Sequence, residues 1–203
     1  EETQIFGAIS MEPALQNAIH QGMPVLIGLP GTHAKWAVVE NNTITDFRTF
    51  MTGELFDVLS RHSILGATMH PGDEPHWDAF THGLTAAQEH HQTGLLSTLF
   101  STRSRLLTSN LTSSSQGDYL SGLLIGHELC GLASSLLRDL PATTPIALIG
   151  SANLNSRYSQ AFSHVFPDRQ IHAIPNATEQ GLWRIAHAAG LLSTNARECT
   201  HAI

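Results

Sequence analysis

One stretch organises the rest of the chain: Pro24-Val25-Leu26-Ile27-Gly28-Leu29-Pro30-Gly31-Thr32-His33-Ala34-Lys35-Trp36-Ala37-Val38-Val39. Two apolar runs flank a short polar turn, a pattern that predicts a β-hairpin. In the turn, Gly31 can adopt a positive φ and lets other groups approach the backbone. Thr32 adds a hydroxyl, His33 an imidazole, and Lys35 is the only lysine of the chain. Backbone N–H groups, a hydroxyl and a cation are the parts that hold phosphate oxygens. The stretch therefore predicts either a phosphate-binding hairpin or a well-made turn with a polar tip.

Composition indicates a globular protein. The chain has 203 residues, of which 41% are hydrophobic and 13% are charged. The formal net charge is −7 and no basic stretch occurs, so we expect no nucleic-acid partner. No apolar run of about 18 residues and no basic-then-apolar leader occurs, so we expect no membrane partner and no signal peptide. Two isolated cysteines, Cys130 and Cys199, favour a reducing compartment, and we expect a cytoplasmic protein.

Thirteen histidines raise the question of a metal site. They include one adjacent pair, His90-His91, but no His-x-x-x-His spacing, and the cysteines form no Cys-x-x-Cys pair. We therefore interpret the histidines as scattered surface residues and expect no protein-held metal. A metal-dependent hydrolase is the alternative, and near-stoichiometric bound zinc would support it. The Gly-x-x-x-x-Gly-Lys-Ser/Thr motif is absent, which excludes a P-loop kinase.

Hydrophobic periodicity predicts an α/β protein with one mixed sheet. In the first part of the chain we expect a helix over 1–22 interrupted or restarted at Pro13, strands at 25–29, 36–39 and 43–50, and a helix from 52 with Thr52 as its N-cap. A looser insertion follows over about 66–117, with a helix at 77–88 and an exposed loop at 101–115 that contains one helical turn around Leu106-Leu107. The last part is expected to form a helix over 118–140, a strand at 145–149, a helix after Ser151, a strand at 170–175, a helix at 178–192 and a loose tail.

Three consecutive antiparallel strands followed by βα units belong on one mixed sheet. Ligands of such sheets bind beyond the carboxyl ends of strands. We therefore expect the hairpin turn and the Gly150-Ser151 turn to face one crevice. Glycines at four- and five-residue spacing in the long helix (Gly122, Gly126, Gly131) predict close packing of another element, with a ligand against the helix as the alternative.

The β-β-β-α-β-α-β-α order is similar to one lobe of the actin / sugar kinase / Hsp70 superfamily, a ribonuclease H-like mixed sheet with helices. Several segments more closely resemble the 2-keto-3-deoxygalactonokinase (2-dehydro-3-deoxygalactonokinase) family. They are residues 1–4, Leu29-Pro30-Gly31-Thr32-His33-Ala34-Lys35-Trp36, residues 46–50, Met51-Thr52-Gly53-Glu54-Leu55, Ser121-Gly122-Leu123-Leu124-Ile125-Gly126, Gly150-Ser151-Ala152-Asn153-Leu154 and Arg184-Ile185-Ala186-His187-Ala188.

This resemblance implies ATP-dependent phosphorylation of the 6-hydroxyl of 2-keto-3-deoxygalactonate, with ATP and Mg2+ as cofactors. It implies a role for each of the two turns. Gly31 and Thr32 would meet the β- and γ-phosphates, with Lys35 or His33 neutralising charge. The adenine–ribose turn would consist of Gly150, Ser151 and Ala152.

The resemblance also suggests substrate-binding and catalytic residues. Arg48 is the candidate for the substrate carboxylate, with a surface ion pair as the alternative. Thr52 and Gly53 would complete the substrate-binding block. Candidate general bases are Glu1, Glu2 and Glu54, of which Glu2 and Glu54 are retained as catalytic candidates; Glu54 can equally be a helix-dipole partner.

The family differs from this chain in one respect. Its members carry further residues upstream, including an Asp-x-Gly-Ser/Thr phosphate loop that does not occur here. We therefore expect residues 1–203 to be a single C-terminal lobe of a sugar-acid kinase, with the N-terminal lobe absent from this chain. The alternative is a nucleotide- or sugar-binding module without turnover. Apolar helices with internal glycines also permit a homodimer.

Overall fold

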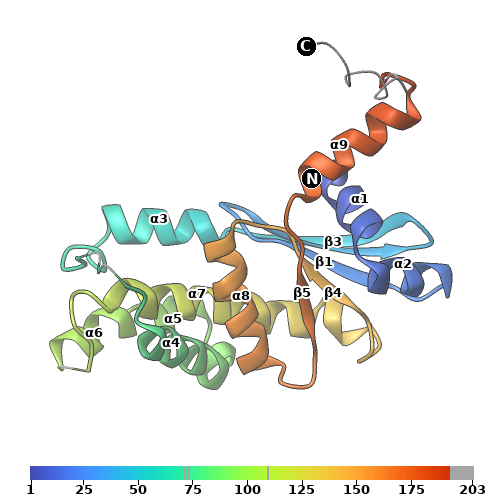
Figure 1. Ribbon diagram of the computed structural model, residues 1–203. Coiled ribbons are helices and arrows are strands. Elements are labelled where there is room, and N and C mark those ends of the chain that lie inside the picture. Colours follow the sequence, from blue (N-terminus) through green and yellow to red (C-terminus); the bar gives the residue numbers. More distant parts are fainter. Residues whose placement is uncertain (71, 73, 109, 193–203) are drawn as a thin grey trace, which may run out of the picture.

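The computed structural model of the protein describes residues 1–70, 72, 74–108 and 110–192. Its centre is a five-stranded sheet in the order β3-β2-β1-β4-β5 (Figure 1). The strands are β1 (Val25–Leu29), β2 (Ala34–Glu40), β3 (Thr43–Phe50), β4 (Ile146–Leu148) and β5 (Ile171–Ala173). Strands β1, β2 and β3 pair antiparallel, whereas β4 runs parallel to β1 and β5 parallel to β4. The predicted hairpin and mixed α/β sheet are confirmed.

Helices cover both faces of this sheet (Figure 1). They are α1 (Glu2–Met11), α2 (Pro13–His20), α3 (Thr52–His62), α4 (Trp77–His90), α5 (Leu95–Leu99), α6 (Ser101–Leu107), α7 (Gln116–Ser134), α8 (Ala152–Val165) and α9 (Ala177–Ala188), with short 3-10 turns at His91–Thr93 and Leu136–Arg138. None of the helices in the described ranges is both long and apolar enough to cross a membrane.

Strand β1 is buried along its whole length because both of its faces are covered. Leu26 packs with Trp36 and with Phe162 of α8 on one face, where α4 and α7 complete the core. Ile27 packs on the opposite face with residues of α1 and α2, including Leu15. The unbroken apolar run in the sequence is therefore explained by two cores on opposite sides of one sheet.

The backbone preferences of proline and asparagine explain where α2 begins and where the chain turns from β2 into β3. Pro13 is the first residue of α2, a position that needs no backbone N–H, and the predicted restart there is confirmed. Asn41 and Asn42 have φ values of 50° and 61°, so this two-residue turn uses the left-handed region that asparagine tolerates. The predicted entry into β3 is confirmed.

Residues 66–117 contribute α4, α5 and α6, and α4 packs directly on α7. A methyl group on Gly122 would lie 2.0 Å from the carbonyl oxygen of Phe80, and one on Gly126 would lie 2.6 Å from Cβ of Ala87. A methyl group on Gly131 would instead lie 3.1 Å from the ring of Phe50. The interpretation of these glycines as packing positions is confirmed.

Two predictions about this region are wrong. The loop expected at 101–115 includes only one helical turn, around Leu106-Leu107, but the helix α6 already begins at Ser101. Polar side chains are satisfied inside the helical layer: the Ser101 hydroxyl bonds the Thr98 carbonyl at 2.6 Å and the Tyr119 hydroxyl at 2.7 Å. The helix expected to reach residue 140 ends at Ser134. Hydroxyls of Ser134 and Ser135 both donate to the Gly131 carbonyl, at 3.1 and 2.7 Å, and compete with the helical ladder. The predicted loose tail and Cys199 lie outside the described residues.

Candidate functional site

Three turns meet at the edge of the sheet where the parallel strands β1, β4 and β5 end. A cavity of about 540 Å³ lies between them, lined by residues 29–33, 149–151 and 176–179, by Glu1 directly before α1, by Gln4 of α1 and by Lys35 of β2. This volume is typical of a site for a small molecule or cofactor. The expectation that the hairpin turn and the Gly150-Ser151 turn face one crevice is confirmed.

The hairpin turn is held in place by the first turn of α3. The backbone N–H of Glu54 donates to the Thr32 carbonyl at 2.9 Å. Gly53 lies so close to the turn that a methyl group there would be 2.4 Å from the carbonyl oxygen of Gly31. Gly31 does not use the positive φ that is open to glycine, and a methyl group on it would meet no described atom within 4 Å. Close packing therefore requires glycine at position 53, while Gly31 borders the cavity.

Lys35 of β2 and His33, which directly precedes this strand, both line the cavity. The Lys35 Nζ lies 2.8 Å from a carboxylate oxygen of Glu1 and 3.3 Å from the His33 carbonyl. The His33 ring Nε2 contacts the carboxylate of Glu54, so each cationic or potentially cationic group of the turn has an acidic partner. Both groups are partly exposed and can reorient toward a ligand.

The β4–α8 turn brings the N-terminus of a helix to the cavity. Ser151 caps α8 by accepting a hydrogen bond from the Leu154 N–H, at 3.4 Å, and Asn155 donates to the Gly150 carbonyl at 3.0 Å. Gly150 and Ser151 line the cavity, while Ala152 is the first residue of α8 behind them. Helix N-termini carry a partial positive charge, which favours anions.

Helix α9 adds a second N-terminus that the sequence analysis missed. Asn176 has a left-handed backbone, at φ 56°, and with Thr178 and Glu179 it borders the cavity. The Gln4 side chain donates to the Thr178 hydroxyl at 2.9 Å, which ties α1 to α9 at this point. The signal was present, because Pro175-Asn176 follows a predicted strand and the carboxyl ends of parallel strands share one edge.

Thr52 and Glu54 lie next to the cavity but outside its lining. Thr52 is the first residue of α3, with Met51 at the N-cap position, so the predicted N-cap role of Thr52 is wrong. The Thr52 hydroxyl is instead directed into the protein and donates to the carboxyl of Glu128. Glu54 lies in the first turn of α3, where its charge suits the helix dipole, and also reaches His33.

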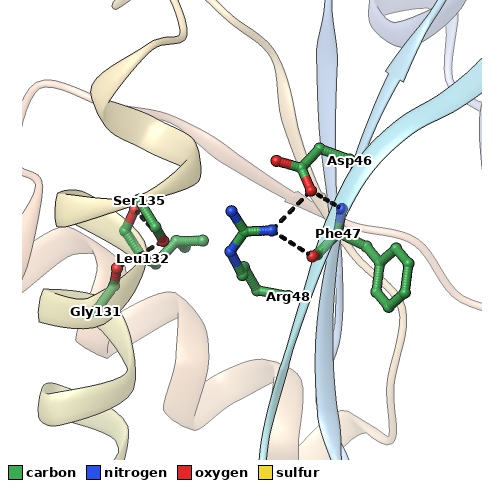
Figure 2. A network of polar contacts seen from close by, with 6 residues as sticks. All are labelled: Asp46, Phe47, Arg48, Gly131, Leu132 and Ser135. Atoms are coloured by element: carbon green, nitrogen blue, oxygen red, sulfur yellow. Dashed lines mark hydrogen bonds and ion pairs between the residues drawn. The ribbon is translucent and has the colours of Figure 1, made fainter.

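Two predicted site residues, Arg48 and Glu2, lie away from this cavity. Figure 2 shows Arg48 on β3 turned toward the last turn of α7, with its guanidinium bonded to Asp46 at 2.7 Å and to the Phe47 carbonyl at 2.8 Å. Both charged groups of this pair are about half exposed, so the surface ion pair considered as the alternative for Arg48 is present. Glu2 is largely exposed and borders a different groove, between α1 and β3.

Comparisons with known proteins agree on one family. The model of the 2-keto-3-deoxy-galactonokinase family matches residues 1–185. The chain is 36% identical over 189 residues to the 2-dehydro-3-deoxygalactonokinase of Escherichia coli, an alignment covering 93% of this chain and 59% of that protein. It is 32% identical to a Rhizobium meliloti protein assigned the same activity, covering 90% and 58% of the two chains.

A solved structure supports the same relationship. The crystal structure of a protein from Sinorhizobium meliloti, assigned as a 2-dehydro-3-deoxygalactonokinase, superposes with a TM-score of 0.75 at 28% identity. The superposition covers 94% of this chain and 60% of that one. This chain therefore spans about three fifths of the length of the relatives it matches.

Proposed function

This chain belongs to the 2-keto-3-deoxy-galactonokinase family, and on that premise we propose that the full-length protein transfers the γ-phosphoryl group of ATP to the 6-hydroxyl of 2-keto-3-deoxygalactonate. The observation that carries the proposal is the single cavity shared by the hairpin turn, Lys35 and the β4–α8 turn. We propose further that residues 1–203 form the C-terminal lobe of this enzyme, with residues 66–117 as an insertion.

In this proposal the hairpin turn and Lys35 bind the triphosphate. Gly31 and Thr32 present backbone N–H groups and a hydroxyl to the β- and γ-phosphates, and Lys35 or His33 neutralises their charge. The adenosine lies against Gly150 and Ser151, with Ala152 behind them. Two helix N-termini and Lys35 at the same cavity favour an anionic ligand, and they oppose the carboxylates of Glu1 and Glu179 that also border it.

The acceptor hydroxyl needs a general base and its carboxylate needs a cation. Glu54 is the better placed of the two retained base candidates, because it contacts His33 at the hairpin turn while Glu2 borders another groove. Arg48 remains a candidate for the substrate carboxylate, and its ion pair with Asp46 would have to open. Thr52 and Gly53 support the turn from behind.

Magnesium enters this scheme as part of the substrate, MgATP: it would be bound by phosphate oxygens and would keep several waters, so that few protein ligands are needed. Among the residues that the structure describes, no group of three or more His, Cys, Asp or Glu side chains is arranged to hold a metal ion. We also propose a cytoplasmic enzyme, and a homodimer is compatible with the sequence. The alternative function is a nucleotide- or sugar-binding module without turnover, which the same cavity would serve.

An ATP-consumption assay of the full-length gene product with 2-keto-3-deoxygalactonate tests the proposal. Lys35→Ala should reduce kcat/KM for ATP about 100-fold, the usual cost of removing one preorganised contact to transition-state charge. Arg61→Ala is the matched control. It removes an exposed cation in the last turn of α3, where Arg61 pairs with Asp57 at 2.9 Å. Nucleotide binding without turnover in the wild-type protein would favour the binding module, and equal rates for wild type and Lys35→Ala would contradict the assigned site.

A further inference from the structure

A buried carboxyl group, that of Glu128, lies where the elements around the cavity meet. Glu128 is in the middle of α7 and is 3% exposed. Its carboxyl accepts hydrogen bonds from Trp36 Nε1 at 2.7 Å, from the Tyr158 hydroxyl at 2.8 Å and from the Thr52 hydroxyl. No cationic side chain of the described residues is among its partners. Burial raises the pKa of Glu128, an effect that the three donated hydrogen bonds oppose.

Stability alone is a weak reason for a carboxyl group here. A buried hydrogen-bonded group can often be replaced by an apolar group of the same shape with little loss of stability, provided that its partners are replaced too. A fully satisfied buried network, in contrast, holds its members in one arrangement. The Tyr158 hydroxyl keeps its proton for this bond, because burial and then the nearby Glu128 raise the pKa of Tyr158 well above its ordinary value.

Two of the three donors belong to elements that reach the cavity lining, and the third begins the helix that packs against the hairpin turn. Trp36 on β2 follows Lys35, and Tyr158 is on α8, which begins beside Ser151. Thr52 begins α3 and precedes Gly53 and Glu54. One carboxyl group thus joins the hairpin, the start of α3 and α8 through α7.

The first turn of α3, which begins at Thr52, is held firmly against the hairpin turn. Gly53 is in backbone contact with Gly31, and the Glu54 N–H is bonded to the Thr32 carbonyl. A displacement of the first turn of α3 must therefore displace the turn that borders the cavity.

We propose that Glu128 is a positioning residue for this cavity, which sets the hairpin turn relative to α3 and α8 through its bonds to Trp36, Thr52 and Tyr158. This proposal rests on the proposed function, because the ligand that the turn meets is there assigned as the ATP triphosphate. Glu128 itself touches no substrate in this scheme.

Four variants of the full-length protein test the positioning role of Glu128. Glu128→Gln alters the acceptor, Thr52→Val removes one donor with little change of shape, and Tyr158→Phe removes another. Tyr119→Phe is the matched control, because this fully buried tyrosine hydroxyl bonds Ser101 at 2.7 Å in the helical layer away from the cavity.

Two measurements are made on each variant. Hydrogen exchange of peptides covering residues 29–36 and 51–56 reports the turn and its bond to Glu54, whether or not the protein turns over. Kinetics report kcat/KM for ATP and KM for the sugar acid separately. We expect faster exchange in both peptides and a loss of about tenfold or more in kcat/KM for ATP in the three network variants, with KM for the sugar acid within about twofold. Tyr119→Phe also removes a buried hydroxyl, and it should match wild type in both measurements.

The outcomes separate the two proposals. Unchanged exchange at the turn overturns the positioning role, and so does a lower melting temperature with unchanged kcat/KM for ATP. Faster exchange in a protein whose wild type consumes no ATP supports the positioning of the turn and overturns the proposed function instead. Should Glu128→Gln fail to fold, Thr52→Val and Tyr158→Phe decide, because each removes a single hydroxyl.

Discussion

Replacing Gly53 with alanine should force the hairpin turn and α3 apart. The new Cβ would lie 2.4 Å from the carbonyl oxygen of Gly31 and 2.8 Å from Cα of Thr32. Both neighbours are backbone atoms, which cannot rotate away as a side chain can. Either the first turn of α3 or the turn that borders the cavity must therefore move.

Two effects of opposite sign determine the magnitude. Alanine in a helix is favoured over glycine by up to about 1 kcal/mol, while overpacking a close contact costs about 1–3 kcal/mol. Because two backbone atoms obstruct the methyl group, we expect a net loss of about 1–2 kcal/mol in the free energy of unfolding. Gly117→Ala, near the start of α7, is the control: its methyl group would meet no described atom within 4 Å, so the propensity gain should remain.

Urea-induced unfolding of both variants gives the free energies, and steady-state kinetics give kcat/KM for ATP. Gly53→Ala should be less stable than Gly117→Ala by about 2 kcal/mol and should use ATP less efficiently, while Gly117→Ala keeps wild-type kinetics. Equal stabilities would refute the packing argument. A destabilised Gly53→Ala with unchanged ATP kinetics would refute the claim that this turn is part of the site.

Further perturbations probe other parts of the molecule. Because burial raises the pKa of Glu128, the folded state binds more protons than the unfolded state between the two pKa values, so this group makes stability fall as pH rises there. The free energy of unfolding, measured with urea from about pH 4 to pH 8, should fall less steeply with pH in Glu128→Gln than in wild type. The same pH dependence in both proteins would contradict a raised pKa for Glu128. Arg48→Ala should cost less than about 1 kcal/mol in the free energy of unfolding, since its ion pair is exposed. If Arg48 is the ligand of the substrate carboxylate, as proposed, its replacement should also raise KM for the sugar acid about tenfold; a KM within about twofold of wild type would leave it as a surface ion pair only. Asn42→Ala should melt at a lower temperature than Asn42→Gly, because alanine in the left-handed region costs about 1–2 kcal/mol.

The elements with strong local signals were predicted well. The apolar runs around the hairpin, the asparagine turn into β3 and the proline at the start of α2 each depend on residues close in sequence. The predictions that failed depend on distant partners. The Ser/Thr-rich composition around residues 101–107 suggested a loop, yet these residues form α6. Their polar groups have partners in another helix, as the bond of Ser101 to Tyr119 of α7 shows.

The candidate site shows the same division. The chemistry of the hairpin turn could be read from its sequence, and its placement beside the Gly150-Ser151 turn followed from the parallel strands β1 and β4. The start of α9 could have been assigned to the cavity in the same way, because it follows the parallel strand β5. Gln4 of α1 could not, because 174 positions separate it from its partner Thr178. Arg48 was grouped with the site by its motif, whereas the pleat of β3 turns it toward α7.

Periodicity and the chemistry of adjacent residues were enough to establish the α/β class, the hairpin and the types of group that the turn offers. The packed fold was needed to show that Gly53, and not Gly31, is the glycine required by close packing, and that Glu128 joins three elements around the cavity. The physical reason is that a close backbone contact and a buried hydrogen-bond network are relations between segments far apart in the chain, and only folding brings their partners within reach.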